Sequence, residues 1–218
     1  WLLLFGLAHY LFIWWGDILF LYAVVGCIAF LFRKWEAVRL IKWALIIYGI
    51  GFLVFALQFG GLQYLQLMAS LPNADPALVA QYQEIVKNPD FSLDASAEIA
   101  AYTGSYADIV ARRWGDISNL LFLILQSITE TLPLMMLGMA MKKNGFLTGE
   151  WERGDYAGWA RKMLIPGLVI SIGLALWVAS SGFDLITTLG NFLAWSMVPR
   201  LLMTIGYAAL LIMAIQSF

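Results

Sequence analysis

The sequence predicts an all-α, polytopic transmembrane helix bundle. Hydrophobic residues make up 62% of the 218 residues and charged residues only 12%, and the mean hydropathy is +0.81. A soluble domain carries about 25% charged residues, so this chain has too few polar side chains to cover a surface that faces water. Because hydrocarbon offers no partners to backbone polar groups, we expect the apolar segments to be helices.

Six segments approach the roughly 17–25 mostly apolar residues that a spanning helix needs. They are residues 1–14, 17–32, 43–67, 117–141, 164–179 and 199–216. The moderately apolar stretch 183–197 contains Asp184, Thr187, Thr188 and Asn191, and we interpret it as interfacial or re-entrant. We predict a single transmembrane domain over 1–218. Since the chain begins and stops inside apolar segments, we expect it to be the middle portion of a longer protein, with six spans as a lower bound.

The charged residues predict an orientation. The segments 33–42 and 142–162 hold nine of the thirteen Lys and Arg residues, whereas 69–116 holds seven acids and three bases. Cytoplasmic loops are enriched in Lys and Arg. The two basic segments are therefore expected in the cytoplasm and 69–116 outside, as in a multi-pass protein of the inner (plasma) membrane. Prolines break the start of the external segment, and a helix is predicted over 94–113.

Composition also excludes several partners and sites. The formal net charge of −1 argues against nucleic acid, which needs a basic surface to neutralise phosphates. One cysteine, and no His, Cys, Asp or Glu pattern with metal-ligand spacing, predicts neither a disulfide framework nor a metal site. We expect membrane lipid as a partner, and the residues alone do not identify a cofactor.

The only histidine and a nearby acid are the first candidate site. His9 lies in the outer part of the first apolar segment, and Asp17 follows across the turn at Trp14–Trp15–Gly16. Imidazole suits general-base catalysis near neutral pH, and a carboxylate can orient it. The alternative is a histidine bonded within the bundle and an aspartate that caps the second helix. Trp15, in the same turn, is a candidate substrate contact.

Three further polar residues are candidates in later segments. Glu130 lies near the middle of the fourth segment, three residues before Pro133, and is either a catalytic or proton-relay group or a neutral or paired carboxylate that joins helices. Arg200, at the outer start of the last segment, either meets an anionic substrate or headgroup or extends to the interface. Asn191 in the ambiguous stretch is a third candidate for substrate binding. We interpret Arg112 and Arg113 as interfacial anchors.

Several short stretches of the sequence together carry a family resemblance. They are Phe-Gly-Leu-Ala-His-Tyr at 5–10, Trp-Gly-Asp-Ile-Leu at 15–19, Tyr-Ala-Val-Val-Gly at 22–26, the run from Glu130 to Ala140 with Asn-Gly-Phe-Leu at 144–147, and Pro-Arg-Leu-Leu at 199–202 with Gly206 and Tyr207. With these stretches the chain resembles the YeiB-like family, a domain-of-unknown-function group of bacterial multi-pass inner-membrane proteins. The order is the one that family shows. The Asp-Arg-Gly first helix and the C-terminal Thr-Asn-Tyr motif of such families do not occur in this chain.

The resemblance implies a function. The family is distantly similar to transmembrane acyltransferases such as the heparan-glucosaminide acetyltransferase, which take an acyl group from cytoplasmic acyl-CoA and place it on an acceptor outside, often with a histidine as base. By that resemblance His9 is the base, Asp17 its neighbour, and Glu130 and Arg200 cavity residues. Two other hypotheses stay open, a transporter that uses Glu130 beside a helix-loosening proline, and a membrane subunit without chemistry.

Overall fold

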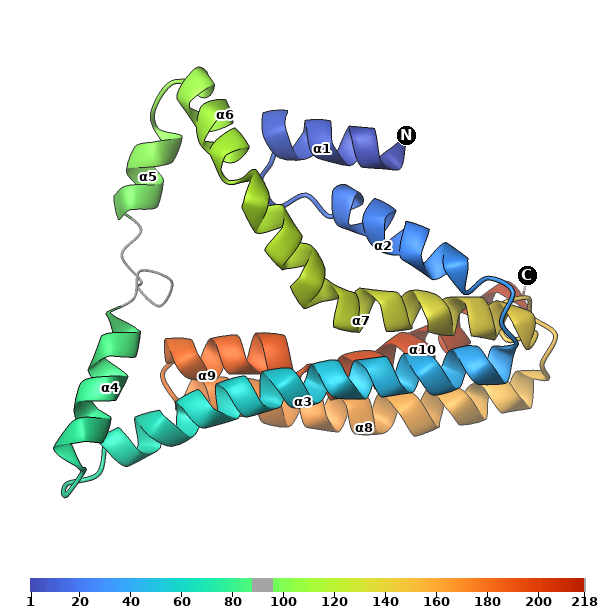
Figure 1. Cartoon of the computed structure of the whole chain (residues 1–218). Helices are drawn as coiled ribbons and strands as arrows, with labels where there is room; N and C mark the ends of the chain where they lie inside the picture. Colours follow the sequence, from blue (N-terminus) through green and yellow to red (C-terminus); the bar gives the residue numbers. More distant parts are fainter. Residues whose placement is uncertain (88–95, 218) are drawn as a thin grey trace. The chain divides into compact units, whose positions relative to one another are not determined.

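The computed structural model describes residues 1–87 and 96–217, which form helices joined by short turns, without a strand (Figure 1). The prediction of an all-α protein is confirmed for this part of the chain. The elements are α1 (Leu2–Phe12), α2 (Leu19–Leu31), α3 (Ala37–Ala69), α4 (Pro76–Val86), α5 (Ser96–Tyr102), α6 (Tyr106–Gly115), α7 (Ile117–Lys143), α8 (Arg153–Ser180), α9 (Leu185–Gly190), the π-helical segment η2 (Asn191–Trp195) and α10 (Met197–Ile215). Positions 94 and 95 of the predicted helix over 94–113 lie outside the described residues.

Four helices are long and apolar enough to cross a membrane within the described residues, namely α3, the part of α7 from Leu123 to Lys143, α8 and α10. These four are compatible with a membrane-embedded protein. The predicted number of about six is not confirmed, because α1 and α2 have 11 and 13 residues. At 1.5 Å per residue, helices of that length reach roughly 16–20 Å, less than the hydrocarbon thickness of about 30 Å.

Two helix boundaries differ from the sequence-based ranges. The helix α8 begins at Arg153, whereas the predicted span began at residue 164, and α3 begins at Ala37 instead of 43. Charged residues such as Arg161 and Lys162 end an apolar run but do not end a helix, since both are good helix formers. Helical residues therefore occupy part of each segment that we predicted to be cytoplasmic. The stretch 183–197 contains the short helix α9 and the π-helical segment η2.

The chain divides into two compact units, each built from two stretches of sequence. Unit 1 comprises Trp1–Tyr48 and Leu93–Ala140, and unit 2 comprises Gly49–Ser92 and Met141–Phe218. The division falls within α3 and α7, so each of these helices contributes to both units.

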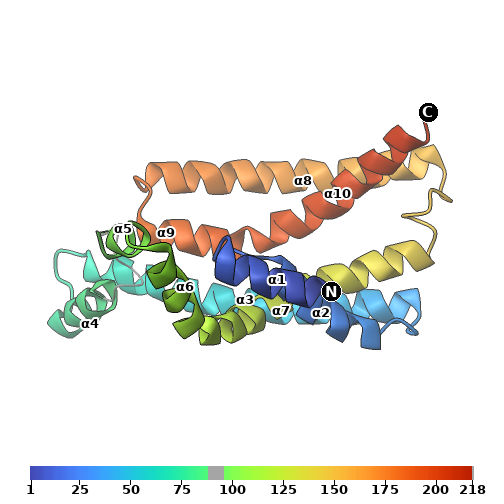
Figure 2. The same ribbon diagram turned by 90° about the horizontal axis from the view of Figure 1, so that it is seen from above.

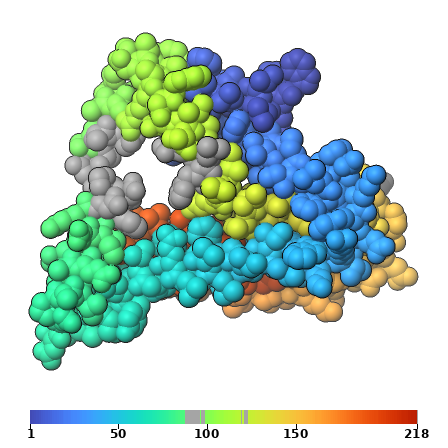
Figure 3. All heavy atoms as spheres, in the orientation of Figure 1, coloured from blue at the N-terminus to red at the C-terminus, as the bar shows by residue number. Residues whose placement is uncertain are grey.

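In unit 1, the N-terminal helices pack closely because Gly6 has no side chain. A Cβ atom at Gly6 would lie 2.6 Å from Phe20 Cα and closer still to Phe20 N, both backbone atoms of α2. Next to this crossing, Tyr10, Leu11 and Leu120 form a buried cluster. Figure 3 shows the atoms of α6 against those of α1. This packing fixes the end of α1, and with it the position of His9.

In unit 2, α8 and α10 pack against each other from Tyr156 to Ser171 of α8. Gly167 of α8 faces Met203, and Gly206 of α10 faces Leu164. Figure 2 shows α10 approaching α8 toward the C-terminus of the chain and diverging from it toward α9. At the end where the two helices converge, Phe146, Tyr156, Ala160 and Ala209 form a buried cluster, and the Tyr156 hydroxyl donates to the Phe146 carbonyl at 2.6 Å.

The second half of α3 is tied to the α9–η2 segment by polar side chains. Trp195 Nε1 donates to Gln63 Oε1 at 3.2 Å, and Gln66 Nε2 donates to Asp184 Oδ1 at 2.9 Å. The other oxygen of Asp184 accepts from Thr187 N at 2.9 Å and so caps α9. The stretch that we expected to be interfacial or re-entrant is thus a helical segment, in which Asp184 and Trp195 bond to α3.

Candidate functional site

The turn between α1 and α2 brings His9 and Asp17 together. The backbone N–H groups of Ile13 and Trp14 both donate to the His9 carbonyl, at 2.9 and 2.8 Å, which ends α1 and reverses the chain. His9 Nδ1 then lies 3.0 Å from Asp17 Oδ1. This is the pairing that the eight-residue spacing across the turn suggested.

Asp17 is fixed by a second interaction. Its Oδ2 accepts a hydrogen bond of 2.7 Å from the backbone N–H of Phe20, in the first turn of α2. Asp17 therefore also has the capping role that we weighed as the alternative. The carboxylate side chain is 1% exposed, whereas the imidazole is 31% exposed. The buried carboxylate is the rigid member of the pair, and the histidine is the member that solvent or a substrate can reach.

The His9–Asp17 contact is short but not aligned as a hydrogen bond. Neither His9 Nδ1 nor Asp17 Oδ1 has a hydrogen-bond partner among residues 1–87 and 96–217, although the two atoms are within bonding distance. The His9 ring also meets Trp14 edge to face, with 6.5 Å between centroids and an interplanar angle of 87°. Trp14 thus limits how the ring can turn.

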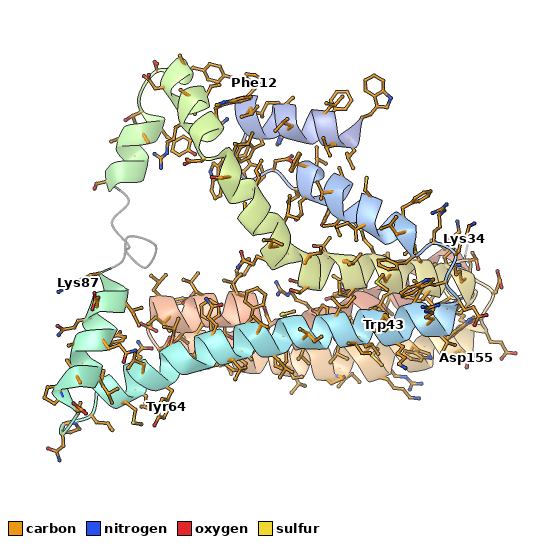
Figure 4. All side chains as sticks on the ribbon, viewed as in Figure 1. Phe12, Lys34, Trp43, Tyr64, Lys87 and Asp155 are labelled. Carbon is orange, nitrogen blue, oxygen red and sulfur yellow. The ribbon has the colours of Figure 1, made fainter. Side chains whose placement is uncertain are left out.

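Residues of α6 hold the end of α1 in place. The Tyr106 hydroxyl donates to the Phe12 carbonyl at 2.7 Å, and Arg113 Nη1 donates to the Leu11 carbonyl at 3.1 Å. Phe12 is labelled in Figure 4, where the end of α1 lies beside α6. A cation at a helix C-terminus also complements the helix dipole. Arg113 is 8% exposed, so it is a buried positioning residue, which is more specific than the interfacial anchor expected from the sequence.

The contribution of α6 was not anticipated, although its sequence holds a signal. Tyr106 and Arg113 are seven residues apart, a spacing that places two side chains on one face of a helix. Their partners are backbone carbonyls, however. Every residue has one, so the sequence does not indicate which carbonyls a side chain will bond.

A small cavity adjoins Asp17. It has a volume of about 230 Å³ and is lined by the turn from Trp15 to Ile18 and by one face of α7 that includes Leu123 and Ser127. Trp15, the predicted substrate contact, therefore lies at the cavity next to Asp17. Ligand pockets for drug-sized molecules occupy about 300–1,000 Å³, so this cavity has room for only a small group.

Glu130 lies on α7, beyond the cavity. It is three residues after Ser127 on the same helix, about 4.5 Å further along the axis and on the same face. It does not line the cavity. Figure 1 shows that α7 changes direction along its course. Pro133 accounts for the bend, because it lies inside the helix and cannot donate the backbone bond to residue 129.

The remaining candidates lie in unit 2. Arg200, in the first turn of α10, places its guanidinium 5.9 Å from the centroid of the Phe192 ring. Asn191 is 7% exposed, and its Nδ2 donates to the Thr187 carbonyl at 3.1 Å. The structure therefore brings His9 to Asp17 and places Asp17 and Trp15 at one cavity, which His9 does not line. Glu130 lies one turn beyond that cavity, and Arg200 and Asn191 lie in the other unit. Among the described residues, no group of three or more His, Cys, Asp or Glu side chains could hold a metal ion.

Comparisons of this chain with protein-family models, with curated proteins and with solved structures each found no match. The resemblance to the YeiB-like family consequently stays a prediction, and the geometry of the site has to support any function proposed for the chain.

Proposed function

We propose that this chain is part of a membrane acyltransferase that moves an acyl group from cytoplasmic acyl-CoA to an extracytoplasmic acceptor. The observation that supports the proposal is the 3.0 Å contact between His9 Nδ1 and the buried carboxylate of Asp17. A histidine oriented by a fixed carboxylate is the arrangement that activates hydroxyl groups for acyl transfer in many enzymes. The family resemblance points to the same chemistry.

The residues have distinct roles in this mechanism. In the proposed mechanism the imidazole turns so that Nδ1–H donates to Asp17, which is held by Phe20 N–H, and Nε2 is left to accept the proton of an acceptor hydroxyl. The hydroxyl oxygen attacks the thioester carbonyl, and a new C–O bond forms as the C–S bond breaks. The imidazolium then returns its proton to the leaving thiolate. Arg113 and Tyr106 act only by positioning the end of α1.

The size of the cavity sets what it can receive. A volume of about 230 Å³ holds an acyl end or an acceptor hydroxyl but not a whole coenzyme A. Trp15 forms part of its wall, and in the proposal contacts the substrate. Glu130, one turn beyond Ser127 on α7, is in the proposal a residue that the substrate passes on its way to the cavity. Arg200 and Asn191 remain the predicted contacts for an anionic group and for a polar group of the substrate.

The test is acyl transfer from radiolabelled acetyl-CoA in inner-membrane vesicles that contain the full-length protein. His9→Ala is expected to lower the rate about 10²–10⁴-fold, the usual contribution of a general base. Asp17→Asn keeps an oxygen that can cap α2 but loses the charge, so a smaller decrease is expected. Asp75→Asn is the matched control, because Asp75 caps α4 by accepting from Ala77 N at 2.8 Å and has no histidine beside it. Transfer that is unchanged in His9→Ala would reject the mechanism.

Transport is the second candidate, and Glu130 supports it. This carboxylate is half-buried within α7, three residues before Pro133, and buried carboxylates beside interrupted helices occur at transport sites. Efflux or uptake that is abolished by Glu130→Gln, with acyl transfer absent, would favour a permease. If both assays are insensitive to both substitutions, the chain is better described as a membrane subunit without chemistry.

We also propose that 33–42 and 142–162 face the cytoplasm and 69–116 the outside of a bacterial inner membrane. The support is the distribution of Lys and Arg. Single cysteines introduced at exposed positions Lys34, Tyr106 and Thr148, in a Cys27→Ala background, should react differently with a membrane-impermeant maleimide. Labelling of Tyr106→Cys alone in intact spheroplasts is expected, and labelling of Lys34→Cys under the same conditions would reverse the orientation.

A further inference from the structure

A second pocket lies within unit 2, between α8 and the α9–η2 segment. It has a volume of about 370 Å³, which is within the range of small-molecule sites. Leu174, Ala175 and Val178 of α8 form one apolar wall, and Thr188, Asn191 and Ser196 contribute polar groups from the other side. This site is independent of the His9–Asp17 pair.

Two buried polar atoms of this pocket have no hydrogen-bond partner in the described part of the chain. They are Asn191 Oδ1 and Thr188 Oγ1. Asn191 is 7% exposed, and its amide nitrogen already donates to the Thr187 carbonyl, so the vacant oxygen can only accept. An unpaired polar atom in such a setting costs stability. A ligand that donates a hydrogen bond to Asn191 would remove that cost.

The other polar groups of the pocket are already engaged. Ser196 Oγ donates to the Phe192 carbonyl at 2.9 Å, and Ser171 Oγ donates to Met203 Sδ at 3.4 Å. The π-helical turn contributes to the arrangement, because Ser196 N bonds to the Asn191 carbonyl five residues earlier at 3.0 Å. Asn191 Oδ1 and Thr188 Oγ1 are thus the side-chain atoms of the pocket that remain without a partner in the described part of the chain.

The chemistry of the lining selects the ligand. No residue that lines the pocket is charged, so a charged headgroup would lose its hydration without compensation. The rim carries Phe183 and Phe192, which are 70% and 64% exposed. Exposed aromatic side chains next to a candidate membrane span are suited to apolar chains. The ligand is therefore expected to be neutral and amphiphilic, with a hydroxyl or amide N–H donor at its polar end.

We propose that this pocket binds the neutral, hydroxyl-bearing head of a membrane lipid of the diacylglycerol type, with the lipid hydroxyl donating to Asn191 Oδ1 and paired with Thr188 Oγ1. The acyl chains of the lipid leave the pocket past Phe183 and Phe192. Lipid binding at this pocket does not require that the chain transfers acyl groups, and it is equally compatible with a transporter or a membrane subunit.

The binding test uses the full-length protein in detergent and native mass spectrometry with 1,2-dioleoylglycerol. Its matched ligand is the same lipid with the hydroxyl acetylated, which keeps the apolar body and removes the donor. Wild-type protein should bind the hydroxyl form roughly tenfold more tightly than the acetylated form. Equal binding of the two lipids would overturn the proposal, and displacement of the lipid by free glycerol at equal concentration would show that the site takes a soluble polyol instead.

Three variants separate binding from folding. In Asn191→Leu and Thr188→Val the new side chain is close in volume to the native one. Asn191→Leu should weaken binding of dioleoylglycerol roughly tenfold, and Thr188→Val roughly fivefold. Thr204→Val is the control, because the Thr204 hydroxyl bonds to the Arg200 carbonyl and does not line the pocket. Wild-type affinity in both Asn191→Leu and Thr188→Val would reject the site.

A fourth variant guards against loss of fold. Phe183 has a φ of 60°, in the left-handed region that favours glycine. Phe183→Gly should therefore leave the unfolding temperature near that of wild type while it removes one apolar side of the rim. A several-fold loss of lipid affinity with an unchanged unfolding temperature is expected. Unchanged affinity would show that the acyl chains do not pass Phe183.

Discussion

The two units hold their helices together in different ways. In unit 1, α1 meets α2 backbone to backbone at Gly6, and its C-terminal carbonyls are bonded by Tyr106 and Arg113. In unit 2, Gly167 of α8 and Gly206 of α10 face side chains first, and the polar contacts to α9 and η2 are made by two amides, one indole and one carboxylate. A backbone contact cannot yield, whereas a side chain can change rotamer.

This contrast extends to the candidate sites. The site of unit 1 contains an ionisable pair beside a small cavity, so proton transfer is the chemistry it can perform. The pocket of unit 2 is larger and has no charged lining residue, so it is suited to hold a neutral molecule. Rigid packing around His9 suits the proposed role as a base, which needs its geometry held to within a fraction of an ångström. The pocket between α8 and η2 suits the proposed binding of a neutral lipid.

The largest effect is expected from Gly6→Ala. A Cβ there would lie 2.6 Å from Phe20 Cα and 2.9 Å from Leu19 C, and backbone atoms of a helix cannot move aside locally. Overpacking of this kind costs about 3 kcal/mol. The thermal unfolding midpoint, followed by tryptophan fluorescence in detergent, should fall by several degrees, and acyl transfer should fall with it because His9 moves.

Gly26→Ala is the control for that substitution. Gly26 lies in α2 of the same unit, and no atom lies within 4 Å of its Cβ position. Alanine there should stabilise the helix by about 0.5–1 kcal/mol. If the two substitutions gave equal midpoints, α1 would not contact α2 at Gly6.

The next largest effect separates two adjacent arginines. Arg113→Met removes a buried guanidinium that bonds to the Leu11 carbonyl, and a hydrogen bond to a charged group contributes about 2 kcal/mol. Arg112 forms an exposed ion pair of 3.8 Å with Asp116, a kind worth about 0–1 kcal/mol. The unfolding midpoint should therefore fall for Arg113→Met and change little for Arg112→Met. If the midpoint fell for Arg112→Met and changed little for Arg113→Met, Arg112 and not Arg113 would be the residue that supports α1.

Sequence reasoning succeeded where a pattern reflects a local cause. The long helices follow from apolar runs, and the His9–Asp17 pair follows from two residues that flank a short turn. Both depend on residues near one another in the chain. The agreement covers the helical class and this pair, and leaves the chemistry as a proposal.

The features that sequence reasoning missed have tertiary causes. Arg113 and its neighbour Arg112 are the same residue type at adjacent positions, yet only Arg113 is buried, because the end of α1 lies on its side of α6. Hydropathy likewise overestimated the lengths of α1 and α2. It records composition, and does not show that the turn from 13 to 18 ends α1 early and delays the start of α2. The π-helical turn that begins at Asn191 and the unpaired side-chain oxygen of this residue likewise have no reliable signal in the sequence.

The smallest effect is expected from Gly206→Ala in unit 2. A Cβ at Gly206 would lie 2.5 Å from Leu164 Cγ and 2.8 Å from Leu164 Cδ2, both side-chain atoms that move when the leucine changes rotamer, and its nearest backbone contact is Leu164 N at 3.2 Å. The leucine can rotate, and alanine gains about 0.5–1 kcal/mol of helix propensity, so the net cost should be about 1 kcal/mol or less. Gly173→Ala in α8 is the control. No atom lies within 4 Å of its Cβ position, so this variant should show the gain in helix propensity without any steric cost. A loss in Gly206→Ala as large as that in Gly6→Ala would mean that α8 and α10 also meet rigidly, and the proposed distinction between a rigid catalytic unit and an adaptable binding unit would fail.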